Sequence, residues 1–273
     1  ARRLPSILPP MSEVEAVEVT RMQSIAGNLR VDGLAGQRPF RAPHHTISAS
    51  GLTGGGSIPM PGEVTLATNG VLFLDEMAEF STRTLEALRQ PLESGSIAVT
   101  RAQQTHVFPA RFTLVGATNP CPCGVGGERC NCTAAEVARY ERRLSGPLLD
   151  RFDIHCRVER PSAEEVESGP VTDSATVRVR VQRARELQGE RFAATDIHCN
   201  GQLDGAQTRR LLKVPDSVQS LISAAYARRA LTMRGYDRSL RVARTIADLD
   251  ERDQISEGDM AEALSLRALE VQA

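Results

Sequence analysis

The sequence predicts an α/β domain built on a parallel sheet, followed by a domain made only of helices. Two short apolar runs, Val71–Leu74 and residues 112–117, are separated by a segment with helical periodicity, residues 81–94. Continuous apolar runs of this length are typical of strands buried on both faces of a parallel sheet. Strands that alternate with helices indicate an α/β layer. From residue 174 onward only helical patterns occur, so a second, all-helical domain is expected there.

Local signals define the elements of the first domain. Ser12 and Glu15 have the spacing of a capping box, which predicts a helix from Ser12 to about Ser24. Residues 32–61 are polar and rich in Gly and Pro, and they predict a loop with at most a short hairpin. The other expected elements are a helix over residues 81–94 that stops at Gly95, a hairpin over residues 97–101 and 106–110, and buried strands over residues 112–117 and 154–158.

A change in composition separates the two domains. Residues 160–173 are polar and contain Pro161 and Pro170, which is typical of a linker. We therefore place the first domain at residues 1–160, the linker at 161–173 and the helical domain at 174–273. Its helices are expected over residues 175–190, 204–213, 216–231, 238–250 and 257–269, with Asp204, Asp216 and Ser256 near their N-caps.

The overall composition excludes several classes of protein. Hydrophobic residues make up 41% and charged residues 25% of the 273 residues, which is typical of a globular chain and argues against disorder. The formal net charge of −1 provides no global basic field, so any contact with nucleic acid must come from local patches. No run of about 18 apolar residues is present, so no membrane partner is expected. No signal peptide opens the chain, and the expected compartment is the cytoplasm.

Two acidic residues, Asp75 and Glu76, directly follow the first apolar run. The carboxyl ends of parallel strands form the ligand-binding edge of an open α/β sheet, so both carboxylates are expected at that edge. In nucleotide hydrolases, the first acid of such a pair helps to hold Mg²⁺ and the second polarises the attacking water. The alternative is a strand that simply ends in solvated acids.

Asn119 and Arg151 follow the same logic. Asn119 comes after the run 112–117 at the same predicted edge, where an amide orients a water or contacts a γ-phosphate; alternatively, it only begins the turn at Pro120. Arg151 precedes the strand expected over residues 154–158. Arginine stabilises charge on a transferring phosphoryl group, from its own or a neighbouring subunit, although a surface ion pair would also account for it.

Taken in order, these segments resemble those of the AAA+ ATPases. The residues that carry the resemblance are 72–76, 117–120 and 148–153, together with 40–46, 61–63, 88–93 and 119–124. Within that superfamily the chain resembles the magnesium-chelatase-like branch, and in particular the ComM/YifB family, over nearly its whole length. The resemblance implies an AAA+ parallel-sheet ATPase domain, truncated at its N-terminus, followed by an all-α lid.

The resemblance also implies roles for individual residues. Those it assigns are Asp75 and Glu76 as the Walker B pair, Asn119 as sensor 1, Arg151 as the arginine finger acting on ATP bound by the next subunit, and Arg234 as sensor 2, with Arg241 and Arg244 as rivals. It further implies ATP and Mg²⁺ as cofactors and a homo-oligomeric ring, most simply a hexamer.

One element of the AAA+ pattern does not occur in this sequence. The phosphate-binding loop Gly-x-x-x-x-Gly-Lys-Ser/Thr requires a lysine, and the only lysine, Lys213, is followed by Val214. In the family resembled, a stretch like residues 1–10 follows almost directly on the lysine of that loop. We therefore expect the chain to begin within the helix after the loop, and to bind ATP poorly and hydrolyse little or none by itself.

Four cysteines lie close together in an insert at residues 121–132: Cys121, Cys123, Cys130 and Cys132. Two close pairs of thiolates suit a tetrahedral Zn²⁺ and do not suit a disulfide framework spread over a secreted fold. The alternatives are an iron–sulfur cluster or four reduced surface cysteines.

The predicted hairpin offers a place for nucleic acid. The segment from Arg101 to His106 resembles the insertion that precedes sensor 1 in this branch and projects into the pore of the ring, so both residues are candidates for contacting DNA. With three tyrosines and no tryptophan, contact with backbone phosphates is favoured over stacking. The alternative is a solvated turn. His44 and His45 are expected to point apart on extended chain, which argues against joint metal ligation.

The resemblance implies an ATP-driven motor that remodels or branch-migrates DNA in recombination or natural transformation. An ATPase subunit that drives Mg²⁺ into a porphyrin is one alternative. Another alternative is a non-catalytic assembly module whose fold is stabilised by a zinc ion.

Overall fold

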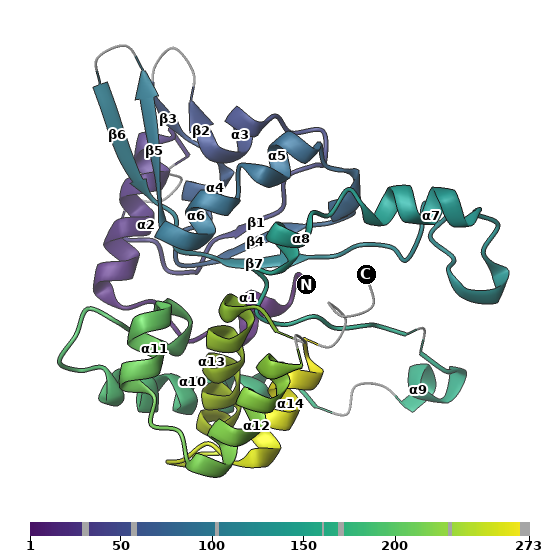
Figure 1. Ribbon diagram of the computed structural model, residues 1–273. Helices are drawn as coiled ribbons and strands as arrows, with labels where there is room; N and C mark the ends of the chain where they lie inside the picture. Colours follow the sequence, from purple (N-terminus) through teal and green to yellow (C-terminus); the bar gives the residue numbers. More distant parts are fainter. Residues whose placement is uncertain are drawn as a thin grey trace. The chain divides into compact units, whose positions relative to one another are not determined.

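The computed structural model describes residues 1–28, 33–55, 59–101, 104–159, 161–168, 172–228 and 231–267 (Figure 1). The chain divides into two compact units. Unit 1 consists of residues 1–5 and 10–149, and unit 2 consists of residues 6–9 and everything from Asp150 onward. The α/β class expected for the first part and the helical class expected for the second are both confirmed.

A parallel sheet lies at the centre of unit 1. Within the described residues its strands follow the order β1 (Phe40–Arg41), β4 (Val71–Leu74) and β7 (Thr113–Gly116). Leu72 and Leu74 of the middle strand are fully buried, as the continuous apolar run predicts. The strand β1 lies inside the segment predicted as a loop, because a two-residue strand is too short to show a period of its own.

Two strand predictions need correction. β7 was expected to be buried on both faces, but its residues are exposed or half-buried, because it is the outermost described strand on its side of the sheet. No strand forms over residues 154–158, where Ile154 and Val158 are 48% and 90% exposed. Instead the backbone N–H of His155 donates to the carbonyl of Leu266 (2.7 Å), so this segment belongs to the helical unit.

Helices and a hairpin complete unit 1. The capping box between Ser12 and Glu15 begins α2 (Glu13–Ile25) as predicted, and Met22 of this helix packs against the hairpin. The helix expected over residues 81–94 is interrupted before Pro91, whose missing N–H cannot continue the ladder from the preceding turn. The other elements of this part of the chain are α1 (Leu4–Ile7), α3 (Ala49–Thr53), β2 (Gly54–Gly55), β3 (Met60–Pro61), α4 (Glu63–Leu66), η1 (Met77–Glu79), α5 (Thr82–Glu86), α6 (Arg89–Ser94), β5 (Ser96–Arg101), β6 (Gln104–Pro109), η2 (Gly127–Arg129), α7 (Ala134–Glu141) and α8 (Gly146–Leu149).

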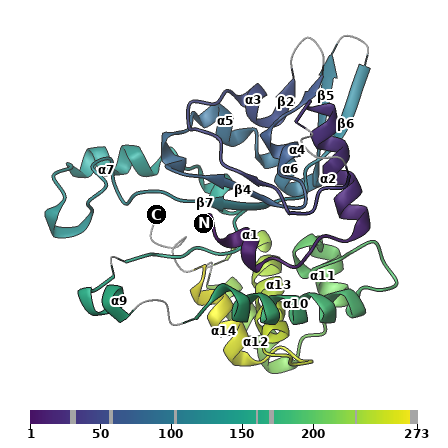
Figure 2. The ribbon, with the colours of Figure 1, turned by 180° about the vertical axis from the view of Figure 1, so that it is seen from behind.

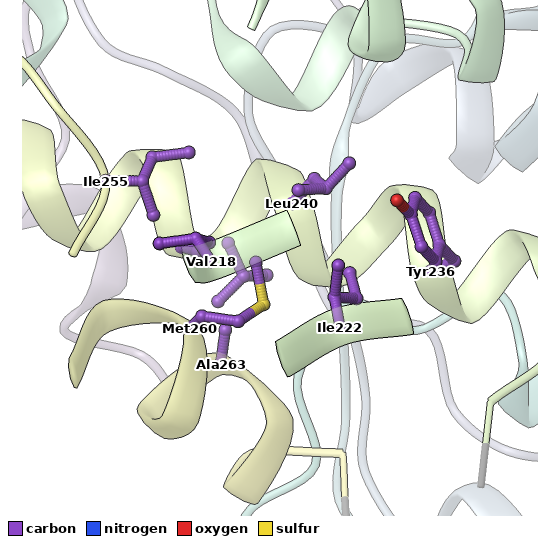
Figure 3. Close-up of a cluster of buried hydrophobic side chains, with 9 residues drawn as sticks. Val218, Ile222, Tyr236, Leu240, Ile255, Met260 and Ala263 are labelled. Carbon is purple, nitrogen blue, oxygen red and sulfur yellow. The ribbon is translucent and has the colours of Figure 1, made fainter. Parts of the chain in front are cut away.

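Unit 2 is a helical domain arranged around α13, which contacts α10, α11 and α14 (Figure 2). Its elements are α9 (Ala163–Ser168), α10 (Ser174–Arg191), η3 (Asn200–Gln202), α11 (Gly205–Leu211), α12 (Asp216–Ala227), α13 (Met233–Leu249) and α14 (Glu257–Ser265). Ile222, Leu240 and Met260 from three of these helices meet in one apolar core (Figure 3). The predicted helices are confirmed, and α9 adds a short helix inside the predicted linker.

The caps of these helices follow the sequence closely. Asp204 and Ser256 each form a capping box, as expected for N-cap residues. Asp216 is the first residue of α12 and directly follows the N-cap residue Pro215, so it lies near the cap as expected. α13 begins at Met233, earlier than predicted, because the Thr232 side chain accepts the backbone N–H of Gly235 and starts the helix there. No helix among the described residues is long and apolar enough to cross a bilayer.

We expect Ser256→Ala to lower the free energy of unfolding by about 1 kcal/mol, because a helix N-cap is lost. The Ser256 hydroxyl accepts the N–H of Asp259 (3.2 Å), and the Asp259 carboxylate accepts the N–H of Ser256 (2.7 Å). Urea denaturation measures the change, with Ser256→Asp as the control that keeps a capping oxygen. Equal stability of the Ala and Asp variants would contradict the assignment.

Candidate active site

Asp75 and Glu76 lie at the carboxyl end of β4, and both side chains are exposed. Glu76 has a φ of +50°, a left-handed conformation that is uncommon for a residue with a Cβ. Its N–H donates to Oδ1 of Asp75 (3.1 Å), which fixes the turn from the strand into η1. A strained backbone at an acidic pair on a sheet edge is typical of a functional site.

Asn119 leaves the sheet beside this acidic pair. Backbone hydrogen bonds continue beyond the paired strands: Ala117 N–H donates to the Leu74 carbonyl (2.9 Å) and Met77 N–H donates to the Ala117 carbonyl (2.8 Å). The chain therefore passes next to Asp75 and Glu76 immediately before it reaches Asn119. The structure brings these three predicted residues to one edge of the sheet, and their catalytic roles stay predictions.

His45 joins the site, and sequence reasoning missed it. Its Nδ1 lies 3.4 Å from Oε2 of Glu76, and both residues line a cavity of about 250 Å³ together with Asp75 and Arg2. The ring centroids of His44 and His45 lie 4.1 Å apart, so the expectation that they point apart was wrong. The reason is that a turn, and not extended strand, follows at these residues. No local pattern in the sequence signals this contact, because it depends on β1, which pairs with the distant strand β4.

Arg151 lies in unit 2 and is only 5% exposed. The residues on either side of it are bound to α13 and to the end of α14. Asp150 accepts a hydrogen bond from the Thr232 hydroxyl (2.8 Å), and the Phe152 carbonyl accepts one from Arg267 (2.7 Å). Arg151 is therefore buried in the described chain, and its role as an arginine finger stays a prediction that requires the side chain to become accessible.

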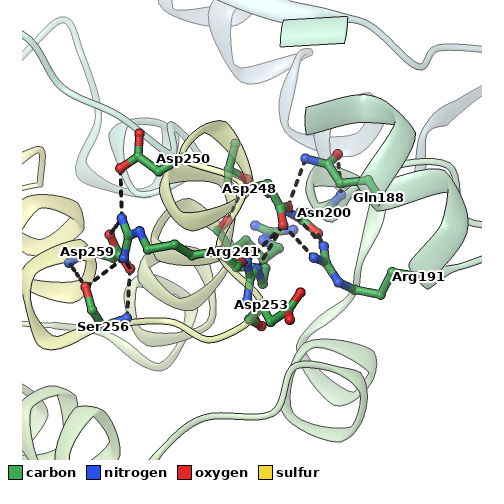
Figure 4. Close-up of polar contacts among 12 residues, drawn as sticks. Gln188, Arg191, Asn200, Arg241, Asp248, Asp250, Asp253, Ser256 and Asp259 are labelled. Atoms are coloured by element: carbon green, nitrogen blue, oxygen red, sulfur yellow. Dashed lines mark hydrogen bonds and ion pairs between the residues drawn. The ribbon is translucent and has the colours of Figure 1, made fainter. Parts of the chain in front are cut away.

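The three arginines considered for sensor 2 differ in their surroundings. Arg234 lies exposed in the first turn of α13. Arg241 donates to the Leu203 carbonyl (2.6 Å) and pairs with Asp153 (3.1 Å), and burial lowers its pKa below the ordinary value. Arg244 is buried and pairs with Asp248 (3.0 Å). Figure 4 shows Asp248 with its other partners Gln188, Arg191 and Asn200. Burial also lowers the pKa of Arg244. Arg241 and Arg244 thus make their contacts inside the helical unit.

The four cysteines of the insert converge. Their sulfur atoms all lie within 4.8 Å of one another. The Sγ of Cys121 lies 3.3 Å from that of Cys123 and 3.5 Å from that of Cys130, and the Cys123–Cys130 distance is 3.7 Å. A hydrogen bond from the backbone of Val125, together with those from the thiols of Cys121 and Cys132, lowers the pKa of Cys123 to about 6. The other two cysteines, Cys156 and Cys199, lie outside the cluster.

The hairpin forms as predicted, with β5 and β6 antiparallel and Val99 opposite His106. It projects away from the sheet (Figure 1). His106 is exposed near the end of the hairpin. Residues 102 and 103 and the side chain of Arg101 lie outside the described part of the chain.

Comparison with known proteins gives concordant matches. A family model described as magnesium chelatase, subunit ChlI, matches residues 1–166, and one described as its C-terminal part matches residues 171–267. The chain is 44% identical over 272 residues to competence protein ComM of Haemophilus influenzae. It is 42% identical over 273 residues to the uncharacterized protein YifB of Escherichia coli. A zygotic DNA replication licensing factor of Xenopus laevis is 31% identical over 93 residues, which are 34% of this chain and 10% of that protein.

The coverage of these matches is unequal. The ComM and YifB alignments cover 98% and 99% of this chain but 53% of either relative, so the chain spans about half the length of the curated relatives it matches. The family models account for both the α/β unit and the helical unit. The chain therefore belongs to the family of the magnesium chelatase subunit ChlI, and within it is similar to ComM and YifB over nearly its whole length.

Proposed function

We propose that this chain is part of an ATP-driven AAA+ motor that remodels or branch-migrates DNA. The observation that carries the proposal is the common sheet edge at which Asp75, Glu76 and Asn119 leave β4 and β7. Acids at the end of a buried strand, beside an amide at the end of its neighbour, are the arrangement that nucleotide hydrolysis needs.

Each residue of this edge has a distinct task in the proposal. Mg²⁺ prefers carboxylate oxygen, and the exposed Asp75 carboxylate would hold the ion that accompanies ATP. When bound, the ion neutralises charge on the phosphates. Glu76 polarises the attacking water and Asn119 orients it. His45, 3.4 Å from Glu76, restrains the side chain that accepts the proton.

Hydrolysis would take place between subunits of a ring, most simply a hexamer. Arg151 would act on ATP bound by the next subunit, which requires it to leave the buried position that it occupies in the single chain. Arg234 would approach the nucleotide from the lid, and its exposure supports it over Arg241 and Arg244.

DNA as the partner is supported by the name of one relative, by the resemblance to the ComM/YifB family and by the hairpin. ComM is named a competence protein, and a DNA replication licensing factor matches part of the chain. The exposed His106, with Arg101 on the facing strand, would contact the phosphate backbone.

The test uses this chain joined to an upstream Gly-x-x-x-x-Gly-Lys-Ser/Thr loop taken from a relative, which we refer to as the loop-joined protein. Movement of a labelled synthetic four-way junction is followed with ATP and with a non-hydrolysable analogue. We expect strand exchange only with hydrolysable ATP. No movement, despite measurable ATP hydrolysis, would reject the DNA motor.

A second candidate is an ATPase subunit that drives Mg²⁺ into a porphyrin, and the description of the matching family favours it. The same assay distinguishes the two, because a chelatase would hydrolyse ATP without moving the junction and would respond to porphyrin. A protein that does neither would be a non-catalytic assembly module.

We also propose that the cysteine cluster holds a structural Zn²⁺. Tetrahedral Zn–S bonds of about 2.3 Å place the sulfurs about 3.8 Å apart. The distances of 3.3, 3.5 and 3.7 Å among Cys121, Cys123 and Cys130 are close to that value, and are much longer than a disulfide bond.

We expect the purified chain to carry one zinc ion, measured by elemental analysis, and Cys130→Ser to lose it. Cys156→Ser is the matched control, because Cys156 lies outside the cluster and is exposed. Iron with visible absorbance in place of zinc would indicate an iron–sulfur cluster. Full zinc content in Cys130→Ser would contradict the assignment of the site.

A further inference from the structure

The cysteine loop, residues 121–132, folds back onto the segment that precedes it. A Cβ on Gly124 would lie 3.8 Å from Cγ of Asn119, which is an ordinary van der Waals contact. A Cβ on Gly126 would lie 2.7 Å from Cγ of Pro120, closer than side chains tolerate. The loop therefore lies against both Asn119 and Pro120, and its position limits theirs.

The far end of the loop is fixed to the same region. Thr133 follows Cys132 and begins α7 with a capping box to Glu136. Tyr140 of this helix is buried, and its hydroxyl lies 3.3 Å from Oγ1 of Thr118. Asn119 is thus held between Thr118, which α7 contacts, and Pro120, which the loop contacts.

The chain just after the same helix reaches the acidic edge. Arg143 pairs with Glu79 (2.7 Å) and donates to the Ala78 carbonyl (3.1 Å), both in η1 directly after Glu76. The stretch from Thr118 to Arg143 consequently begins and ends beside the candidate active site.

Apolar packing does little to order the loop itself. Cys121 is buried, but Cys123 is exposed, as is Val125. Positive φ occurs at three glycines of the loop, Gly124, Gly126 and Gly127. Because glycine adopts many other backbone conformations equally well, these residues do not by themselves hold the loop in its ordered conformation. Ordering such a chain costs conformational entropy that buried surface does not offset here. An ion shared by four thiolates supplies that free energy instead.

We infer that the ion bound by the four cysteines positions Asn119, so that metal occupancy sets the rate at which the candidate site hydrolyses ATP. The effect on hydrolysis rests on the proposed function, whereas the ordering of Asn119 does not. Asn119 is the group that meets water or phosphate. The cysteine loop is a positioning element that acts through it.

Metal removal tests the ordering in the chain itself. Amide hydrogen exchange is measured with Zn²⁺ bound and after chelation. If metal removal lowers the free energy of local opening by about 1.4 kcal/mol or more, the amides in that segment exchange at least about tenfold faster. We expect that acceleration at the backbone N–H groups of Asn119, Cys121, Cys123 and Gly124, since Pro120 and Pro122 have none. No change is expected at Val71–Leu74 in the core of the sheet. Equal exchange at those four N–H groups with and without the metal would overturn the inference.

Two neighbouring glycines provide a pair of variants that differ in their effect on Pro120. Both glycines have positive φ, +64° at Gly126 and +57° at Gly127, so alanine meets backbone strain at either position. Gly126 also has a ψ of 174°, in a region almost confined to glycine, so strain and clash act together there. Only at Gly126 does the added Cβ strike Pro120, while the space at Gly127 is open. Both variants keep all four cysteines and are expected to bind one Zn²⁺. In Gly126→Ala, the loop and Pro120 must move apart, and Asn119 is joined directly to Pro120.

In the loop-joined protein we expect Gly126→Ala to lower kcat about tenfold with little change in KM for ATP, because a displaced positioning group affects the transition state more than binding. Gly127→Ala is expected to stay within about twofold of the parent. Equal kcat values in the two variants would overturn the inference. If the parent shows no ATP hydrolysis, the proposed function fails and the exchange experiment alone decides whether the metal positions Asn119.

Discussion

Glu76→Gln is expected to reduce ATP hydrolysis by the loop-joined protein at least about 100-fold, because a general base at this position contributes about 10²–10⁴-fold. The amide keeps the size of the side chain but cannot accept the proton of the attacking water. Mg-ATP binding should persist, since Asp75 and not Glu76 is proposed to hold the ion. Steady-state hydrolysis and binding of a fluorescent ATP analogue separate the two effects.

Glu79→Gln is the matched control for this substitution. Glu79 is also an exposed acid just beyond β4, but it pairs with Arg143 (2.7 Å) at the surface. Removing one exposed ion pair costs no more than about 1 kcal/mol, so the rate of hydrolysis should change little. Similar rates in Glu76→Gln and Glu79→Gln would show that Glu76 is not the base.

Asp248→Asn is expected to lower the free energy of unfolding by about 3–5 kcal/mol, because it breaks a buried ion pair and leaves buried charge uncompensated. Asp248 is fully buried and pairs with both Arg191 and Arg244 (Figure 4). It also accepts hydrogen bonds from Gln188 (3.2 Å) and Asn200 (2.8 Å). The asparagine amide has no negative charge to balance the two guanidinium groups. Its NH₂ group is itself a donor and would face the N–H donors that the carboxylate accepted.

The control is Asp250→Asn, two residues along the same chain. The side chain of Asp250 is 49% exposed and pairs with Arg180 and Arg252, which are 61% and 39% exposed. Such a pair contributes at most about 1 kcal/mol. Urea unfolding, followed by circular dichroism, should therefore separate the two variants clearly. If Asp248→Asn is as stable as Asp250→Asn, the buried cluster is not what holds α10 to α13.

Much of the fold follows from local sequence. The apolar run of β4 and the caps at Ser12, Asp204 and Ser256 were predictable, because each depends on residues within a few positions of one another. The two-residue strand β1 was not, because its existence depends on pairing with a strand distant in the chain. Nor was the absence of a strand at residues 154–158, since apolar side chains there have no neighbouring strand to join.

The candidate site divides in the same way. Motifs at the ends of β4 and β7 predicted that Asp75 and Asn119 meet at one edge, because parallel strands align their carboxyl ends. The contact of His45 with Glu76 was not predictable, since it requires the turn after β1. Arg151 was a candidate because arginine suits a transferring phosphoryl group. Its burial was not predictable, because it depends on how distant parts of the chain pack around residues 150–153.

The most direct test of the account is the rate of ATP hydrolysis by the loop-joined protein with and without branched DNA. We expect hydrolysis that branched DNA stimulates, and that Glu76→Gln abolishes under both conditions. Hydrolysis that is indifferent to DNA would contradict the DNA motor, and hydrolysis that survives Glu76→Gln would contradict the proposed active site.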